Sequence, residues 1–185
     1  MRPERALSGR LVTVEPLHER HREGLRAAAA AGPEIFRFMA WPGDFDRWFE
    51  QALAGADVPF AVCVAGEPVG STRYLNYAPE HRRVEIGWTW LRRSAWGTGA
   101  NVEAKLLLLG HAFDGHGLQR VEFKTDARNQ QTRGSLLALG ARFEGIARKH
   151  MILPTGPRDS AWYSILDEDW PAVRERLERR LAKVS

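Results

Sequence analysis

Residues 93–115 read RSAWGTGANVEAKLLLLGHAFDG, and the two glycines near the start of this stretch decide how the chain is interpreted. An apolar, strand-like run (RVEIGWTWL, residues 83–91) precedes them, and an unbroken helical pattern over about 98–114 follows. Glycine weakens a helix and loses chain entropy on folding, so Gly-x-Gly at a helix start indicates a tight turn or a close ligand. The free N–H groups of a helix N-terminus favour an anion as that ligand.

Three phosphate-binding loops place glycines in this setting. A P-loop needs G-x-x-x-x-G-K-[ST], which the sequence lacks, so an ATPase or kinase of that type is excluded. A dinucleotide fingerprint needs G-x-G-x-x-G, and Val102 stands where its third glycine would be. The third template, R/Q-x-x-G-x-G/A, holds the pyrophosphate of coenzyme A, and residues 94–99 read SAWGTG after Arg92 and Arg93. From the motif alone, a structural turn is an equal alternative.

The composition is that of an ordinary globular chain. Its 185 residues are 44% hydrophobic, which is enough for one hydrophobic core. The net charge of +4 favours anionic ligands. No apolar run is long enough to span a membrane, and no apolar stretch follows the basic N-terminal residues, so we expect neither a membrane span nor a secretory signal. Cys63 is the single cysteine, which is typical of the cytoplasm.

Hydrophobic periodicity predicts an alternation of strands and helices in one α/β domain over residues 1–185, with 171–185 as a C-terminal helical extension. Three strands joined by short turns precede the glycine loop, which argues against a doubly wound parallel sheet. We predict strands over 10–16, 58–66, 69–77, 83–91 and 120–126, helices over 18–30, 44–55, 98–114 and 129–140, a closing hairpin around 154–157, and a last helix from Trp170.

The residues around the loop resemble a known family. The stretches VEIGWTWLRRSAWGTGANVEAKLLLLGHAF, RVEFKTDARNQQTRGSLLALGARFEG and RDSAWYSI…DW are similar to the GNAT superfamily of N-acetyltransferases, and nearest to its RimJ/RimL-like branch. The resemblance covers roughly residues 8–171, and the spacing from the loop to Asn129 and Gly140 fits. It implies an α+β fold with a mixed, mostly antiparallel sheet and helices on both faces. The sheet would splay between strands 83–91 and 120–126, where acetyl-CoA would lie.

The resemblance also implies residues that hold acetyl-CoA. Its pantetheine arm would pair with backbone at Thr89–Leu91, which includes Trp90, and a main-chain N–H near Trp88–Trp90 would stabilise the oxyanion. Asn129 would bond the same arm or cap its helix, and both roles are compatible. No metal is expected. The pyrophosphate would lie on backbone N–H groups of Arg92, Arg93, Gly97, Thr98, Gly99 and Ala100.

Glu85 is the candidate general base. A lysine amine has a pKa near 10.4 and needs a base at neutral pH, whereas an α-amino group near 7.7–8.0 needs less help. Strand alternation predicts that Glu85, Gly87 and Thr89 share one face. An ion pair with Arg73 or Arg83 is the structural alternative.

The general acid is less evident. Many superfamily members carry a tyrosine seven residues after the asparagine, but this chain has Leu136 there. Thr132 is therefore the candidate that would stabilise or protonate the leaving thiolate, with Ser135 or bulk water as alternatives.

Side chains for the acceptor are expected near the first two helices and the closing hairpin. The candidates are Phe38, Trp41, Tyr163 and Glu85, with Arg158 and Asp159 nearby, although the aromatic residues would also serve as core. We interpret His18 and His21 as surface histidines rather than zinc ligands, and Cys63 as inert core.

These observations predict an acetyl-CoA-dependent N-acetyltransferase that acts by direct attack in a ternary complex. Its acceptor would be a primary amine, either a protein N-terminus or a small molecule, and a homodimer is possible through the last hairpin. A catalytically weak, CoA-binding regulatory module is the alternative, which the missing tyrosine supports. No RNA-recognition motif or basic stripe indicates a nucleic-acid partner.

Overall fold

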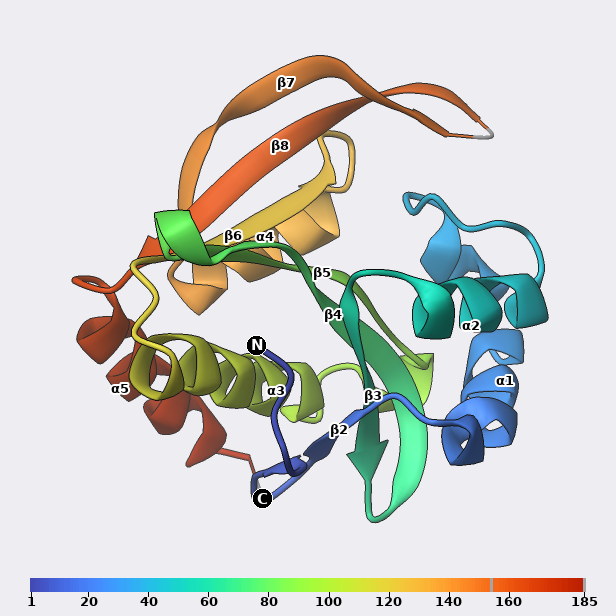
Figure 1. Ribbon diagram of the computed structural model, residues 1–185, viewed down its shortest axis with the longest axis horizontal. Helices are drawn as coiled ribbons and strands as arrows, with labels where there is room; N and C mark the ends of the chain where they lie inside the picture. Colours follow the sequence, from blue (N-terminus) through green and yellow to red (C-terminus); the bar gives the residue numbers. More distant parts are fainter. Residues whose placement is uncertain (154, 185) are drawn as a thin grey trace.

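Eight strands form one sheet in the order β1-β2-β3-β4-β5-β6-β8-β7 (Figure 1). The structure is a computed structural model and describes residues 1–153 and 155–184. All neighbouring strands run antiparallel except β5 and β6, so the predicted mixed, mostly antiparallel sheet is confirmed. The strands are β1 (Leu7–Ser8), β2 (Thr13–Pro16), β3 (Val58–Val64), β4 (Glu67–Ala78), β5 (Arg83–Leu91), β6 (Arg120–Asp126), β7 (Arg142–Leu153) and β8 (Gly156–Leu166).

Four α-helices and several short helical turns connect the described strands, and a fifth α-helix follows β8. A π-helical segment, η5 (His111–Gly115), continues α3, and 3-10 turns are η1 (Glu19–His21), η2 (Pro33–Phe36), η3 (Pro79–His81) and η4 (Arg93–Ala95). Within the described ranges, none of the helices has the length and apolar character that a membrane crossing requires. The α-helices are α1 (Arg22–Ala30), α2 (Phe45–Ala54), α3 (Ala100–Gly110), α4 (Gln130–Leu139) and α5 (Trp170–Leu181).

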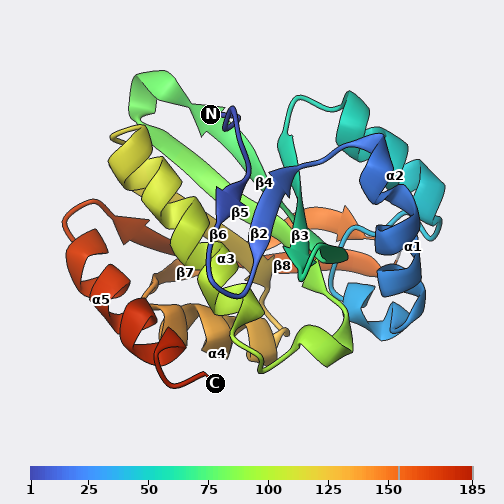
Figure 2. The same ribbon diagram turned by 90° about the horizontal axis from the view of Figure 1, so that it is seen from below.

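The helices cover both faces of the sheet, as predicted. Figure 2 shows α3, α4 and α5 gathered on one side and α1 and α2 beside β3. On the α3 side, Leu108, Phe123 and Leu177 belong to a continuous apolar core. On the other side, α1 and α2 pack on Ala61 and Trp90. The sheet therefore separates two cores, and β3 and β5 contribute buried residues to both.

The predicted first strand over 10–16 is too long. The ladder of β2 begins at Thr13 because the preceding backbone bonds elsewhere. The N–H groups of Arg10, Leu11 and Val12 donate to the carboxylate of Glu103 on α3, at 3.0, 2.6 and 2.7 Å. A buried glutamate on a helix that is distant in the sequence thus determines where β2 begins.

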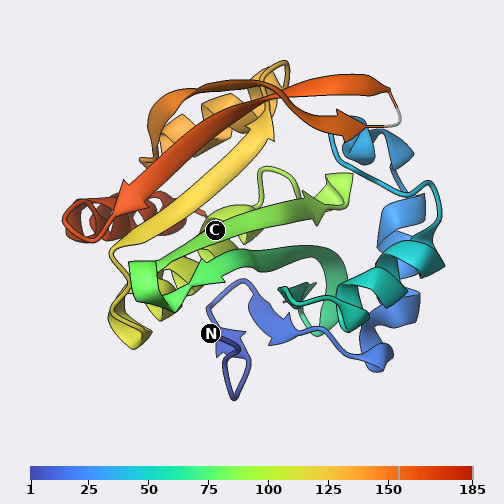
Figure 3. The same ribbon diagram turned by 45° about the horizontal axis from the view of Figure 1, so that its top comes forward.

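The sheet splays at its one parallel pair. In the described chain, β5 and β6 pair only from Arg83↔Arg120 to Glu85↔Glu122, and beyond Glu85 they diverge (Figure 3). The predicted opening between these strands is confirmed. The long β7–β8 hairpin extends past it toward the η2–α2 region (Figure 1). Of the turn predicted in this hairpin, Pro154 lies outside the described residues.

Candidate active site

A β-bulge interrupts β5 beside the opening. Arg73↔Gly87 and Ser71↔Trp90 are successive same-face pairs of β4 and β5, so two residues of β5 oppose a single residue of β4. Within the bulge, Trp88 adopts a left-handed backbone with φ 51°. Bulges of this kind bend a strand and redirect its side chains, and they leave backbone groups outside the ladder.

The bulge overturns part of the expected alternation. Glu85 and Gly87 share a face, but Thr89 is turned to the α3 side, and Trp90 packs in the α1–α2 core on the Glu85 side. The prediction that Thr89 shares the face of Glu85 was wrong because one extra residue reverses the period-2 pattern.

A buried lysine on α3 donates a hydrogen bond to the bulged segment of β5. Lys105 on α3 donates from Nζ to Thr89 Oγ1 at 2.6 Å, and the Thr72 hydroxyl lies 2.8 Å from the same oxygen. Burial disfavours the ammonium form and lowers the pKa of Lys105 to about 7. Lys105 was not among the residues predicted for the site, although a charged residue directly before the run LLLL was a visible signal.

Glu85 lies at the point where β5 and β6 separate, and its side chain is only 2% exposed. Its Oε2 accepts from Asn76 Nδ2 at 2.8 Å and from Lys124 Nζ at 3.3 Å. Oε1 has no hydrogen bond with the described residues and lies beside Gly87, 3.2 Å from where a β-carbon would be. One oxygen is held in place and the other is available at the bulge.

The ion pair that the sequence offered as an alternative role exists with a different partner. Arg83 Nη1 binds Glu122 at 3.2 Å, and Arg73 lies 3.7 Å from Asp57. The partner of Glu85 is Lys124, which comes from β6 across the apex of the splay. Neither arginine named from the sequence fills that role, because each has an acid of its own.

The polar residues of β6 alternate along one face. Glu122, Lys124 and Asp126 are two residues apart, and their partners on β8 are Ser164, Trp162 and Ser160. Lys124 faces Glu85 from this row, so the same face carries the base candidate and its cationic neighbour. The signal in the sequence was the pattern RVEFKTD, whose period of 2 places these three side chains together.

The two loop glycines need glycine for different reasons. Gly97 has φ +76°, and a β-carbon there would meet nothing within 4 Å. Gly99 has φ +86°, and its β-carbon would lie 2.8 Å from Leu11 Cδ1. Both adopt left-handed conformations that cost other residues roughly 1–2 kcal/mol. Gly99 fits a turn packed against protein, whereas Gly97 borders open space at the start of α3.

The arginines before the loop already have partners on the protein surface. Arg93 pairs with Glu34 at 2.7 Å and stacks on Trp96, and Arg92 lies 3.7 Å from Glu67. The buried Nε of Arg92 has no hydrogen-bond partner among the described residues.

Other residues predicted to bind the cofactor are also bonded within the protein. The Leu91 carbonyl accepts from the Trp96 indole at 2.8 Å. The Thr98 hydroxyl donates to the Ala95 carbonyl at 2.8 Å and accepts from Ala100 N at 3.4 Å.

At the start of α4, the Asn129 side chain caps the helix by accepting from Thr132 N at 3.0 Å. Thr132 is half-buried, Ser135 is exposed, and Leu136 is buried in the core where a tyrosine would be expected. Capping leaves the Asn129 amide N–H groups uncommitted to that bond, so the cap and a ligand contact are compatible.

The acceptor candidates fall into two groups. Phe38 and Trp41 are half-buried in the segment between η2 and α2, where Trp41 stacks on Phe36 with ring centroids 3.7 Å apart. Tyr163 is 1% exposed and its hydroxyl accepts from Arg133 Nε at 3.0 Å. Tyr163 therefore lies in the core beneath α4 rather than on an exposed wall.

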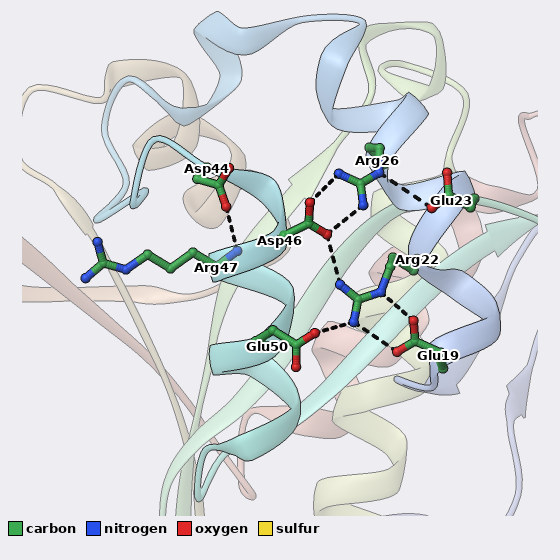
Figure 4. Close-up of polar contacts among 8 residues, drawn as sticks. All are labelled: Glu19, Arg22, Glu23, Arg26, Asp44, Asp46, Arg47 and Glu50. Atoms are coloured by element: carbon green, nitrogen blue, oxygen red, sulfur yellow. Dashed lines mark hydrogen bonds and ion pairs between the residues drawn. The ribbon is translucent and has the colours of Figure 1, made fainter.

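Ion pairs join α1 and α2 on either side of the segment that carries Phe38 and Trp41, which we call the aromatic wall. Asp46 on α2 binds Arg22 at 2.9 Å and Arg26 at 2.6 Å, both on α1 (Figure 4). Arg22 also contacts Glu19 and Glu50 (Figure 4). The two arginines lower the pKa of Asp46 to about 2, so this network is charged at neutral pH. Because exposed ion pairs are individually weak, the network acts mainly as an orienting device.

One histidine is not where the sequence placed it. His21 is 3% exposed rather than a surface residue, and its Nδ1 accepts from the His18 backbone N–H at 3.1 Å. Its Nε2 lies 3.1 Å from Glu15 and the Cys63 thiol is close by. Because Nδ1 accepts a hydrogen bond, the ring proton is on Nε2 and points to the Glu15 carboxylate. His21 is therefore hydrogen-bonded on both ring nitrogens by groups of the protein.

A family model described as "Acetyltransferase (GNAT) domain" matches residues 11–142. Among curated proteins, none matches the chain in sequence. A T. thermophilus protein assigned as an acetyltransferase is 37% identical, with a TM-score of 0.88 over 98% of this chain and 99% of that one. A GCN5-related N-acetyltransferase from Brucella melitensis is 30% identical, with a TM-score of 0.92 over 99% and 88%. RimJ from Mycobacterium smegmatis, solved with CoA-disulfide, shares the fold at 23% identity, with a TM-score of 0.81 over 95% and 91%.

Proposed function

Because the chain belongs to the GNAT acetyltransferase family, we propose that it transfers the acetyl group of acetyl-CoA to a primary amine by direct attack in a ternary complex. The observation that carries this proposal is the arrangement at the apex of the splay. There, a buried glutamate lies beside a bulged strand edge, with one oxygen that has no hydrogen bond to the part of the chain that the structure describes. The likeness to RimJ agrees with a RimJ/RimL-like branch.

The residues around the splay fit the coenzyme. Beyond Glu85, the β6-facing edge of β5 is outside the described ladder, so its backbone would pair with the pantetheine arm. The open space at Gly97, the N-terminus of α3 and the Nε of Arg92, which has no partner in residues 1–153 and 155–184, would receive the pyrophosphate. Asn129 would bond the arm from the α4 side. Acetyl-CoA supplies an acetyl group activated as a thioester.

Glu85 would accept the proton of the acceptor amine at Oε1, directly or through water. The neighbouring ammonium of Lys124 disfavours a second positive charge in the same place. An acceptor amine entering beside it would therefore lose its proton more readily than in water. Thr132, at the first turn of α4, would donate to the sulfur as it leaves.

The proposal is tested by thiol release from acetyl-CoA with N-terminal peptides, amino acids, polyamines and aminoglycosides as acceptors. We expect release to depend on both substrates and on no metal, with an acetylated amine as product. Tight binding of acetyl-CoA without turnover of any amine would instead favour the regulatory module, which the leucine at position 136 supports.

Gly97→Val is expected to weaken acetyl-CoA binding about 10-fold or more, because its side chain would fill the space proposed for the pyrophosphate. Gly66→Val is the matched control, since Gly66 in the β3–β4 turn has φ +82° and equally open surroundings. Both variants carry similar backbone strain, so equal losses of acetyl-CoA affinity in calorimetric titrations would contradict the assignment.

We also propose a cytoplasmic homodimer. The single cysteine is buried and reduced, which suits the cytoplasm. The outer strand β7 exposes Phe143 and Ile146, at 46% and 47%, along an edge that can pair with a second copy. Sedimentation velocity should show a concentration-dependent dimer that Ile146→Lys dissociates, and a monomer at all concentrations would refute it.

A further inference from the structure

Two arginines on the Glu85 side of the sheet are buried without full hydrogen bonding. Arg73 and Arg158 are each 6% exposed, and the Nε of each has no partner among the described residues. A guanidinium has five N–H donors, and leaving them unmet away from water is costly. Burial accordingly lowers the pKa of both groups from the ordinary arginine value. An anion at this place would supply the missing acceptors.

Arg158 lies where β8 crosses toward the η2–α2 segment. Its Nη1 donates to the Phe38 carbonyl at 3.2 Å, so it joins the hairpin to the aromatic wall. The nearby carboxylate of Asp126 is held by Arg128, at 2.9 and 2.8 Å, and forms no ion pair with Arg158 among the described residues. Register places Arg158 two residues before Ser160, which pairs with Asp126, and hence on the face that carries Lys124.

Arg73 adds positive charge on the same face from β4, the strand that pairs with the opposite edge of β5. Its guanidinium lies 4.8 Å from the ring centroid of Trp88 and 5.6 Å from that of Trp48. Its nearest carboxylate, on Asp57, is 3.7 Å away and one-third exposed. Cation–π contacts stabilise a guanidinium but do not satisfy its N–H donors.

The charges on this face do not cancel. Glu85 is neutralised by Lys124, Asp126 by Arg128, and Arg73 by Asp57, which leaves Arg158 as a buried cation with no ion pair among the described residues. Such a surface repels polycationic amines and attracts an acceptor that also carries negative charge.

We propose that the acceptor is an amine bearing a carboxylate or phosphate, and that this anionic group binds the guanidinium of Arg158. This inference rests on the proposed acetyl transfer and names the class of acceptor. The anion would bond Nε and the free edge of the guanidinium, and the amine end would reach Glu85. Simple polyamines and aminoglycosides would be poor acceptors.

Pairs of acceptors with and without the anionic group test the inference. Alanine is compared with alaninamide, and phosphoethanolamine with ethanolamine, in steady-state acetylation by the full-length protein. We expect kcat/KM to be at least about 30-fold higher for one or both anionic members, and the arm with the larger ratio identifies the anion. Members without the anionic group that react as well as the members that carry it would overturn the inference.

Arg158→Gln should raise KM for the anionic acceptor about 30-fold or more, with a smaller change in kcat and little change for the neutral one. Arg158→Lys should retain part of the preference, because it keeps the charge without the fork. Arg148→Gln, at an exposed arginine of the neighbouring strand β7, is the control. An unchanged preference in Arg158→Gln would overturn the assignment.

A binding measurement separates this inference from the proposed transfer. Calorimetric titrations with CoA present compare two pairs of products. N-acetylalanine should bind more tightly than N-acetylalaninamide, or N-acetylphosphoethanolamine more tightly than N-acetylethanolamine. Arg158→Gln should abolish the difference. This holds even if no acceptor is turned over, in which case the transfer fails and the anion site stands. Equal binding of charged and neutral compounds in both pairs would refute the anion site, whatever the turnover.

Discussion

Glu85→Gln should lower kcat about 100-fold or more while leaving acetyl-CoA affinity nearly unchanged. The substitution preserves shape and the contact with Asn76 but removes the proton acceptor at Oε1. The loss should be larger for lysine-like amines than for α-amino groups, because more of the former is protonated at neutral pH. Rates measured across pH 6–10 with one acceptor of each kind check this expectation.

Two variants separate a base from a structural ion pair. Lys124→Met removes the partner of Glu85 but leaves its carboxylate, so its effect should be smaller than that of Glu85→Gln. Glu122→Gln changes the acid opposite Glu85 in the register, which is bound by Arg83 and Arg120. Equal losses in all three variants, or a pH-independent loss in Glu85→Gln, would contradict the role of base.

Lys105→Met should change how stability depends on pH. Folded Lys105 has a pKa of about 7, against 10.5 for an ordinary lysine, so between these values the unfolded chain binds more protons than the folded one. The free energy of unfolding should therefore rise with pH across this window, by about 3 kcal/mol between pH 7 and 10, relative to the variant. Urea unfolding of both proteins at several pH values measures the difference.

The comparison isolates Lys105 from other titrating groups. Burial raises the pKa of Cys63 to about 11, which acts in the opposite direction above pH 9, but it is common to both proteins and cancels. Lys183→Met, at an exposed lysine near the C-terminus, gives the baseline. A difference between wild type and Lys105→Met that is flat with pH would show that Lys105 keeps its proton in the folded state.

Much of the architecture follows from local pattern. Period-2 alternation located the central strands, and Gly140, which has φ +110°, ended α4 as expected of a helix C-terminus. The opening of the sheet was predicted through the family resemblance rather than from periodicity. The pattern RVEFKTD contained the row of polar side chains opposite Glu85, but nothing local showed which strand it would face.

The features that were missed depend on contacts between distant segments. The left-handed turn at Trp88 is invisible in the regular alternation of RVEIGWTWL, yet it moves Thr89 to the opposite face. The start of β2 depends on Glu103, about 90 positions away. Tyr163 alternates into the core only because β8 packs under α4, and Lys124 meets Glu85 only across a parallel pair.

Calorimetric titration with acetyl-CoA most directly tests whether the splay between β5 and β6 binds the coenzyme beside Glu85. We predict one site per chain in the wild type, a similar affinity in Glu85→Gln, and a clear loss in Gly97→Val but not in Gly66→Val. The absence of binding in the wild type, or equal affinity in Gly97→Val, would contradict it.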